Sequence, residues 1–347
     1  MKTGTGRTAI AWLMCMILTL AGCAGPEGEQ PQEPSRQTRV DLLGTVISIT
    51  VYDQLDQAIF DEAFSIVAGV DALMSTNRED SEVVAISAHS GKEPVAVSEE
   101  TYALIERAVG FSQLCDGAFA ITIGAVMQLW KQDETFAVRP ADAEIANRLP
   151  LVNYQDVILS EAGVMLAREG MALDLGAIAK GYACDKVLEY LQSQGVTAAL
   201  LDFGGNIHVY GAKPDGAAWK LGIRSPIIGE NGLICTVELK ESKSIVTSGG
   251  YERYFEQDGT TYHHLLDPKT GYPADSGVIS VTIIDPSSAR ADALSTACFV
   301  LGAEKGMGLL ATLPESEGIF VLEDHSIIIT PGLQGIVTLT DDRFELK

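Results

Sequence analysis

The hydrophobic pattern divides most of the chain into short alternating segments and a few longer segments with helical spacing. Residues 40–52 alternate and are rich in β-branched side chains, which predicts a strand. Residues 55–74 and 98–114 repeat apolar side chains at helical spacing, the second behind Ser98 as a suitable N-cap. A hairpin is expected over 157–173, a helix over 290–301 and a short tail after the last strand. Further strands are expected at 198–203, 208–210, 219–223, 235–239, 245–251, 262–266, 278–284, 318–322 and 327–330.

The stretch from Met171 to Tyr182 organises the rest of this pattern. It opens as an apolar run, expected to be a strand, that holds one carboxylate, Asp174. It then turns at Gly176 and passes Lys180 into a helical run at 182–191. A strand, a glycine turn and a helix start leave free backbone N–H and C=O groups that can meet a charged ligand. A strand-to-helix connection with a capping Asp is the alternative, and both interpretations stay open at this point.

Strands in meanders with helices between them are typical of an α+β fold with mixed or antiparallel sheets. No repeat with a period of 20–50 residues is present. We therefore expect one domain over residues 38–347.

The first residues predict a secretion signal with a lipid anchor. Lys2 and Arg7 precede an apolar run at 9–20 that is too short to span a bilayer comfortably. The run ends in Leu20-Ala21-Gly22-Cys23, which is similar to a bacterial lipoprotein cleavage box. Residues 1–22 are thus expected to be a signal peptide, and 23–37 a lipidated Cys23 followed by a flexible tether rich in Pro, Glu and Gln. The expected location is extracytoplasmic, anchored to a bacterial cell membrane.

Composition narrows the classes of partner. The hydrophobic fraction of 46% supports a large core, and the formal net charge of −23 disfavours binding to nucleic acid. An anionic ligand would need a bound cation or a local Lys or Arg. Apart from Cys15 and Cys23, the cysteines are widely spaced without a Cys-x-x-Cys pair, which disfavours a zinc site and predicts buried thiols. A disulfide stays open among Cys115, Cys184, Cys235 and Cys298.

Two groups of residues could carry chemistry. On a helix at 290–301, Asp292 and Thr296 share a face beside Ser295, and these hard oxygen donors suit Mg²⁺ or Ca²⁺. An Asp N-cap followed by small helix residues is the alternative, and both interpretations stay open at this point. An Asp on a helix face is rarely a core residue, so we expect Asp292 to be replaceable without loss of the fold. In the segment 262–271, the two imidazoles of His263 and His264 precede a tight turn, and a His with a near-neutral pKa can act as a general base. A hairpin with one exposed His is the alternative, and both interpretations stay open at this point. The P-loop, Gly-x-Ser-x-Gly and His-Glu-x-x-His motifs are all missing from the sequence.

Several segments, taken together and in order, resemble the ApbE family of FAD:protein FMN transferases over essentially the whole mature region. The matching segments are Leu43-Gly-Thr45, Met74-Ser-Thr76, Gly117-Ala-Phe119 with Ile121-Thr122, Asp174-Leu-Gly-Ala-Ile-Ala-Lys-Gly181, Asp202-Phe-Gly-Gly-Asn206, Thr247-Ser-Gly249, His264-Leu-Leu-Asp-Pro268 with Thr270-Gly271, and Ala291-Asp-Ala-Leu-Ser-Thr296. The resemblance implies an ApbE-like, T-fold-like α+β domain.

The resemblance also implies a reaction. FAD would bind with Mg²⁺ (Ca²⁺ is the alternative), and a Thr or Ser hydroxyl of a client protein would attack the phosphorus on the FMN side. AMP would leave, and FMN would stay attached through a phosphoester. The implied clients are flavin-carrying subunits of membrane redox complexes and similar flavoproteins. Two alternatives remain: hydrolysis of FAD to FMN and AMP, and a lipid-anchored FAD-binding protein without turnover.

The resemblance assigns roles residue by residue. Metal ligands would be Asp292, Thr296 and the carbonyl of Ala177, with Ser295 as a further candidate. His264 is the candidate base, with an activated water or Asp267 as substitutes, and Asp174 would act in the FAD site with Lys180. Contacts to the flavin nucleotide would come from Leu43, Asn77, Ala118, Phe119, Ala120 and Leu266.

The sequence departs from the family pattern at the flavin contacts. Met is usual where Leu43 stands, a volume-conserving change that should keep a packing contact. An aromatic residue is common at Asn77 and an Asp at Ala120, while Pro often stands where the chain has Ala125. These differences bear on the flavin pocket and not on the metal face.

Overall fold

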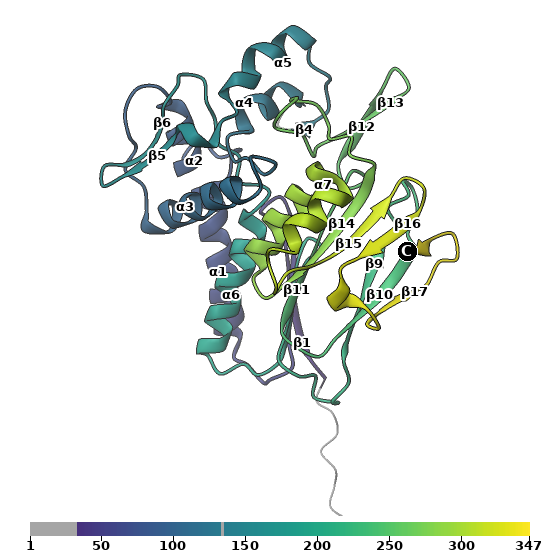
Figure 1. Cartoon of the computed structure of the whole chain (residues 1–347). Helices are drawn as coiled ribbons and strands as arrows, with labels where there is room; N and C mark the ends of the chain where they lie inside the picture. Colours follow the sequence, from purple (N-terminus) through teal and green to yellow (C-terminus); the bar gives the residue numbers. More distant parts are fainter. Residues whose placement is uncertain (1–32, 133–134) are drawn as a thin grey trace, which may run out of the picture. The chain divides into compact units, whose positions relative to one another are not determined.

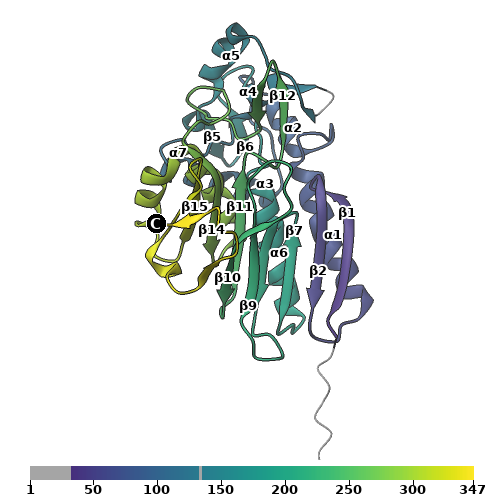
Figure 2. The same cartoon turned by 90° about the vertical axis from the view of Figure 1, so that its right-hand side faces the viewer.

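A nine-stranded sheet forms the centre of the computed structural model, which describes residues 33–132 and 135–347 (Figures 1 and 2). Neighbouring strands pair antiparallel except the last two, which are parallel. In spatial order the strands are β1 (Ser35–Leu42), β2 (Thr45–Val51), β7 (Ala199–Phe203), β8 (Asn206–Tyr210), β11 (Lys243–Gly249), β14 (Val278–Asp285), β15 (Glu317–Leu322), β16 (Ser326–Ile329) and β18 (Glu345–Leu346).

Helices cover one face of this sheet. They are α1 (Gln57–Met74), α3 (Glu99–Leu114), α6 (Ala179–Ser193) and α7 (Ser288–Leu310), and Figure 1 shows α1 and α6 side by side. Alternation along β2 and β7 directs their apolar side chains into a core shared with α1, α3 and α6. The apolar side of α7 packs on β11, β14 and β15 in a second cluster. Both α6 and α7 are thereby held against the sheet and against each other.

A second, smaller sheet covers the opposite face. It contains β9 (Trp219–Arg224), β10 (Leu233–Leu239) and β17 (Val337–Leu339). Their inward residues meet Val209, Ile245 and Ile284 of the main sheet in a separate core. The middle of the main sheet is thus buried on both sides, which explains why β14 is buried along almost its whole length.

Most of the remaining elements lie at one end of the main sheet, and an aromatic cluster around Trp130 packs several of them together (Figure 1). The Trp130 indole N–H donates to the Gly271 carbonyl at 3.0 Å. These elements are α2 (Glu82–Ala88), α4 (Gly124–Met127), α5 (Asp142–Arg148), β3 (Lys131–Gln132), β4 (Thr135–Phe136), β5 (Val157–Ser160), β6 (Gly163–Leu166), β12 (Tyr254–Gln257), β13 (Thr260–His263) and four short 3-10 helices at Gln128–Trp130, Leu149–Leu151, Tyr154–Asp156 and Pro331–Leu333.

The α+β class is confirmed, and α3 begins after Ser98, whose side chain accepts from the Thr101 N–H as an N-cap. Several element predictions are wrong. The strand expected over 40–52 is the β1–β2 hairpin, and its first strand starts at Ser35, inside the range expected for the tether. The apolar run from Met171 is no strand, because its backbone pairing is a single bridge between Ala172 and Ile123.

Further differences concern the ends of elements. The strand expected over 262–266 ends at His263, the helix expected over 290–301 runs from Ser288 to Leu310, and the expected C-terminal tail contains β17 and β18. The helix α7 is long and apolar enough to cross a membrane by composition, but half of that window is buried in the molecule, as in a core helix. The four cysteines of the described region are free and buried, as expected. Residues 1–32, with the expected signal and Cys23, lie outside the described residues.

Candidate functional site

The first turn of α6 meets the side chain of Asp292 on α7. The Gly181 N–H donates to Asp292 Oδ2 at 3.1 Å, and Lys180 Nζ lies 3.5 Å from Asp292 Oδ1. Gly181 is required by close approach, since a Cβ there would lie 2.3 Å from the Ser288 carbonyl oxygen. The organising stretch and the helix expected at 290–301 are therefore in direct contact.

The burial of Asp292 corrects the expectation that it lies outside the core. Its exposed fraction is 3%. A buried carboxylate is costly unless it is paired and hydrogen-bonded, and here Lys180 and the Gly181 N–H supply both. Removing Asp292 would therefore affect the packing of α6 on α7 as well as any ligand.

Asp174 shapes the loop before α6. Its Oδ1 accepts from the Gly176 N–H at 2.8 Å, and the Gly176 carbonyl accepts from Lys180 Nζ at 3.2 Å. The Asp174 N–H donates to the Ile121 carbonyl at 2.7 Å, which places the segment 118–123 alongside this loop. Asp174 thus caps the turn, the role that the alternative interpretation gave it, and remains partly exposed.

Hydroxyl groups from two elements gather beyond Asp292. Ser295 is fully buried, and its Oγ donates to the Asp292 carbonyl at 2.9 Å. The Ser248 Oγ on β11 lies 2.8 Å from Ser295 Oγ and 3.4 Å from Thr296 Oγ1. Ser248 was not among the predicted site residues. Its only sequence signal is the segment Thr247-Ser-Gly249 at the end of an apolar strand.

His264 follows β13 and is partly buried. Burial lowers its pKa to about 3, and the positive charges of Arg253 and Lys180 act in the same direction. The imidazole is therefore neutral near pH 7. Its Nδ1 lies 3.1 Å from the Arg253 carbonyl, so Nδ1 carries the proton and Nε2 is the free acceptor. The charge of Lys180 reaches this ring, which links His264 electrostatically to the turn before α6.

The other predicted flavin contacts occupy different surroundings. Leu43 lies in the β1–β2 turn with a φ of 51°, a backbone region that bulky residues rarely adopt. Asn77 is exposed in the loop after α1, and Ala120 is partly buried. The side chains of Ala118, Phe119 and Leu266 belong to hydrophobic clusters. Within the part of the chain that the structure describes, none of these residues hydrogen-bonds to Asp292, so their roles stay predictions.

The donor set around Asp292 suits a hard divalent cation. The Asp292 carboxylate, the hydroxyl groups of Ser248 and Thr296, and the Gly176 carbonyl, which shares Lys180 with Asp292, are oxygen ligands of the kind that Mg²⁺ and Ca²⁺ prefer. The Ala177 carbonyl stays a predicted ligand. Among residues 33–132 and 135–347, no group of three or more His, Cys, Asp or Glu side chains could hold a metal ion. The residues therefore fit a cation that shares its coordination sphere with an anionic ligand, and not a transition metal held by protein alone.

The fold is similar to that of a class of solved proteins. The ApbE protein of Thermotoga maritima superposes with a TM-score of 0.79 at 34% identity and covers 88% of this chain and 99% of that one. The flavin transferase ApbE from Vibrio cholerae superposes with a TM-score of 0.77 at 28% identity and covers 88% and 100%.

The ApbE family model matches residues 43–320, and the chain belongs to the ApbE family. Two relatives carry the description FAD:protein FMN transferase. The protein of Treponema pallidum (strain Nichols) is 37% identical over 100% of both chains. That of Klebsiella pneumoniae (strain 342) is 39% identical over 83% of this chain and 90% of its own.

Proposed function

We propose that the site between α6 and α7 moves FMN from FAD to a Thr or Ser hydroxyl of a client flavoprotein, with a divalent cation at the pyrophosphate. The chain is a FAD:protein FMN transferase, as its relationship to the full-length relatives indicates. The main support for the proposed mechanism is that the Asp292 carboxylate lies beside Lys180 and Gly181 at the start of α6. This arrangement brings one anionic and one cationic side chain to a helix N-terminus.

Asp292 and Thr296, with the Ala177 carbonyl, would hold the cation, with Mg²⁺ as the first choice and Ca²⁺ as the alternative. Ser295 is a weaker ligand candidate, because its hydroxyl already bonds to the Asp292 carbonyl and lies against Ser248. When bound, the cation supplies positive charge that offsets the charge growing on the phosphates in the transition state. Lys180 would contact the same phosphates from the α6 side.

His264 would accept the proton of the client hydroxyl at Nε2. The new bond joins that oxygen to the FMN-side phosphorus, and the bond from this phosphorus to the bridging oxygen breaks as AMP leaves. In the free protein burial holds the pKa of His264 low, and the charges of Arg253 and Lys180 act in the same direction. The negative pyrophosphate would oppose these charges and raise the basicity of the ring when FAD is bound.

The test combines purified chain, FAD, Mg²⁺ and a client domain, with covalent flavin fluorescence and mass spectrometry as readouts. We expect Asp292→Asn to abolish labelling. His264→Ala should slow it by about 10²–10⁴-fold, the usual contribution of a positioned base, with FAD binding kept. FMN and AMP without a labelled client would instead indicate hydrolysis.

His263→Ala provides the matched control. His263 neighbours His264 but points elsewhere, with Nε2 3.2 Å from the Ala274 carbonyl and its ring against Phe299. This variant should lose stability yet keep the labelling rate per folded molecule. If it labels as slowly as His264→Ala, the base assignment is wrong.

The proposed location is the outer side of a bacterial cell membrane, with a lipid on Cys23 and flavin-carrying subunits of membrane redox complexes as clients. The support is the sequence alone, in the lipobox-like Leu20-Ala21-Gly22-Cys23. Cys23→Ser should move the chain from the membrane fraction to the aqueous fraction without changing its transfer activity. Retention of the variant in the membrane would contradict the anchor.

A further inference from the structure

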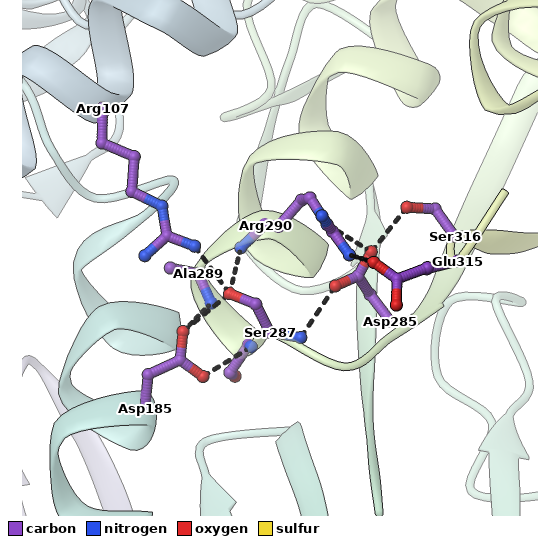
Figure 3. A network of polar contacts seen from close by, with 9 residues as sticks. Arg107, Asp185, Asp285, Ser287, Ala289, Arg290, Glu315 and Ser316 are labelled. Carbon is purple, nitrogen blue, oxygen red and sulfur yellow. Dashed lines mark hydrogen bonds and ion pairs between the residues drawn. The ribbon is translucent and has the colours of Figure 1, made fainter. Parts of the chain in front are cut away.

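The start of α7 is held by a side chain of α6. Asp185 accepts from the Ser288 N–H at 2.7 Å, the Ala289 N–H at 3.1 Å and the Ser287 hydroxyl at 2.7 Å (Figure 3). Ser287, the N-cap of α7, also accepts from the Arg290 N–H. The first N–H groups of a helix have no partner within it, so Asp185 and Ser287 together satisfy those of α7.

The start of α6 is held in turn by a side chain of α7. The acceptor of the Gly181 N–H in the first turn of α6 is Asp292 Oδ2. Asp185 lies four residues after Gly181, and Asp292 lies four residues after Ser288, so each pair shares one helix face. Each helix therefore gives a carboxylate to the first turn of the other, and the Gly181 backbone packs against the Ser288 carbonyl between the two contacts.

We propose that Asp185 is a positioning residue for flavin transfer, which fixes α7 along α6 so that the Asp292 carboxylate stays at the Gly181 N–H. This inference rests on the proposed function, because it gives a residue outside the site a role in that reaction. Asp292 would share its oxygens with a cation during turnover. Asp185 lies outside the proposed cation site. Its hydrogen bonds to the start of α7 would therefore keep the position of α7 along α6 when the contact of Asp292 with the Gly181 N–H weakens.

The surroundings of Asp185 favour this role. Burial raises its pKa, and the hydrogen bonds from α7 act in the opposite direction. A second network fixes the other side of the same helix start, where the buried Asp285 accepts from Arg290 Nε at 2.7 Å and from the Ser287 N–H at 2.7 Å. Arg107 of α3 donates to the Ser287 hydroxyl at 2.8 Å (Figure 3). Asp185 is the member of this network that connects α7 to the helix bearing Lys180 and Gly181.

The first test is hydrogen exchange of the full chain without ligands, resolved to single residues. In Asp185→Asn one carboxylate oxygen becomes an amide nitrogen that faces an N–H donor. We expect exchange at the Gly181 N–H to accelerate at least about tenfold, although the acceptor of this N–H is Asp292 and not the Asp185 side chain. A structural role confined to the start of α7 would accelerate Ser288 and Ala289 alone and would overturn the proposal.

Asp53→Asn is the matched control. Asp53 accepts from the Thr197 N–H at 2.8 Å, the Thr197 hydroxyl at 2.7 Å and the Ala198 N–H at 3.2 Å, the same set of donors that Asp185 has. Thr197 lies just past the C-terminal end of α6, away from Gly181. Equal acceleration at Gly181 in both variants would reflect general loosening and would also overturn the proposal.

The second test measures the Mg²⁺ concentration that gives half-maximal labelling of a client. Loss of a partner that orients a ligand usually costs 10–100-fold in metal affinity or activity, so we expect a rise of about tenfold or more in Asp185→Asn and no change in Asp53→Asn. Fast exchange at Gly181 with an unchanged Mg²⁺ requirement would support the positioning of Asp292 and contradict its role as metal ligand. An unchanged Gly181 would contradict the positioning role whatever the Mg²⁺ requirement.

Discussion

His208 on β8 shows how a single buried side chain sets a pH limit on the fold. Its exposed fraction is 1%, its Nδ1 lies 2.7 Å from Ser244 Oγ, and burial lowers its pKa to about 4. The pKa of an unfolded His is near 6.5. Between that pH and about 4, His208 is therefore protonated in the unfolded state but neutral in the folded state. Above about pH 6.5 the titration of His208 does not affect the unfolding free energy. As the pH falls from there towards 4, it lowers the unfolding free energy more and more.

We therefore predict that the unfolding free energy falls between pH 7 and pH 5, with roughly 2 kcal/mol of the fall due to His208. Urea unfolding of the wild type and His208→Gln at both pH values measures it. Glutamine can still bond to Ser244 but does not titrate, so the variant should lose correspondingly less stability on acidification. Equal losses in the two proteins would show that His208 is not the group responsible.

At the scale of elements, the helix α7 carries the site residues in its first half and is interrupted at Gly302. Gly302 has a φ of 78° and a ψ of 174°, a conformation open essentially to glycine, and a Cβ there would lie 3.0 Å from the Ser276 carbonyl oxygen. Asp292, Ser295 and Thr296 all precede the break. The second half of the helix can thus take a different direction from the half that carries the site residues.

Gly302→Ala should lower the unfolding free energy by about 1–3 kcal/mol and leave the labelling rate per folded molecule unchanged. Gly308→Ala in the same helix is the control. Its added Cβ meets nothing within 4 Å, so it should stabilise the chain by about 0.5–1 kcal/mol. Calorimetry of the two variants decides the matter, and a neutral Gly302→Ala would mean that the break is not required.

The same element shows what a sequence can and cannot predict. The spacing of Asp292 and Thr296 on one helix face followed from periodicity, as did the N-cap at Ser98. The burial of Asp292 did not, because it depends on α6, more than a hundred residues earlier in the chain. The run from Met171 looked like a strand because it is apolar, but it is a loop whose backbone meets Ile121 and Ile123, about fifty residues earlier in the chain, through one hydrogen bond and one bridge.

At the scale of the whole molecule, long-range pairing decides the site. The family resemblance supplied Lys180, His264 and Asp292 as a set, whereas periodicity alone would have left them in three unrelated segments. The order of strands in the sheet places β11 next to β14 and under α7. The Ser248 hydroxyl on β11 therefore lies close to the Thr296 hydroxyl on α7. Beyond its place in the segment Thr247-Ser-Gly249, such a hydroxyl carries little signal in one sequence, because a Ser at the end of a strand is common in any fold.

The net charge makes a final prediction about how FAD reaches this site. A chain of net charge −23 repels a dinucleotide with a negative pyrophosphate, and one lysine and one cation attract it only at short range. Salt screens this long-range repulsion, because the Debye length is only about 10 Å at 0.1 M ionic strength. Contacts within a partly buried site are screened much less. At constant free Mg²⁺ the association rate constant of FAD should therefore rise with KCl between about 10 and 150 mM, as stopped-flow flavin fluorescence can measure. Lys180→Gln should weaken FAD binding. The association rate constant of this variant should still rise with KCl, since the repulsion comes from the whole surface. A rate that falls with salt would mean that a local basic surface steers the ligand and that the overall charge is irrelevant to its capture.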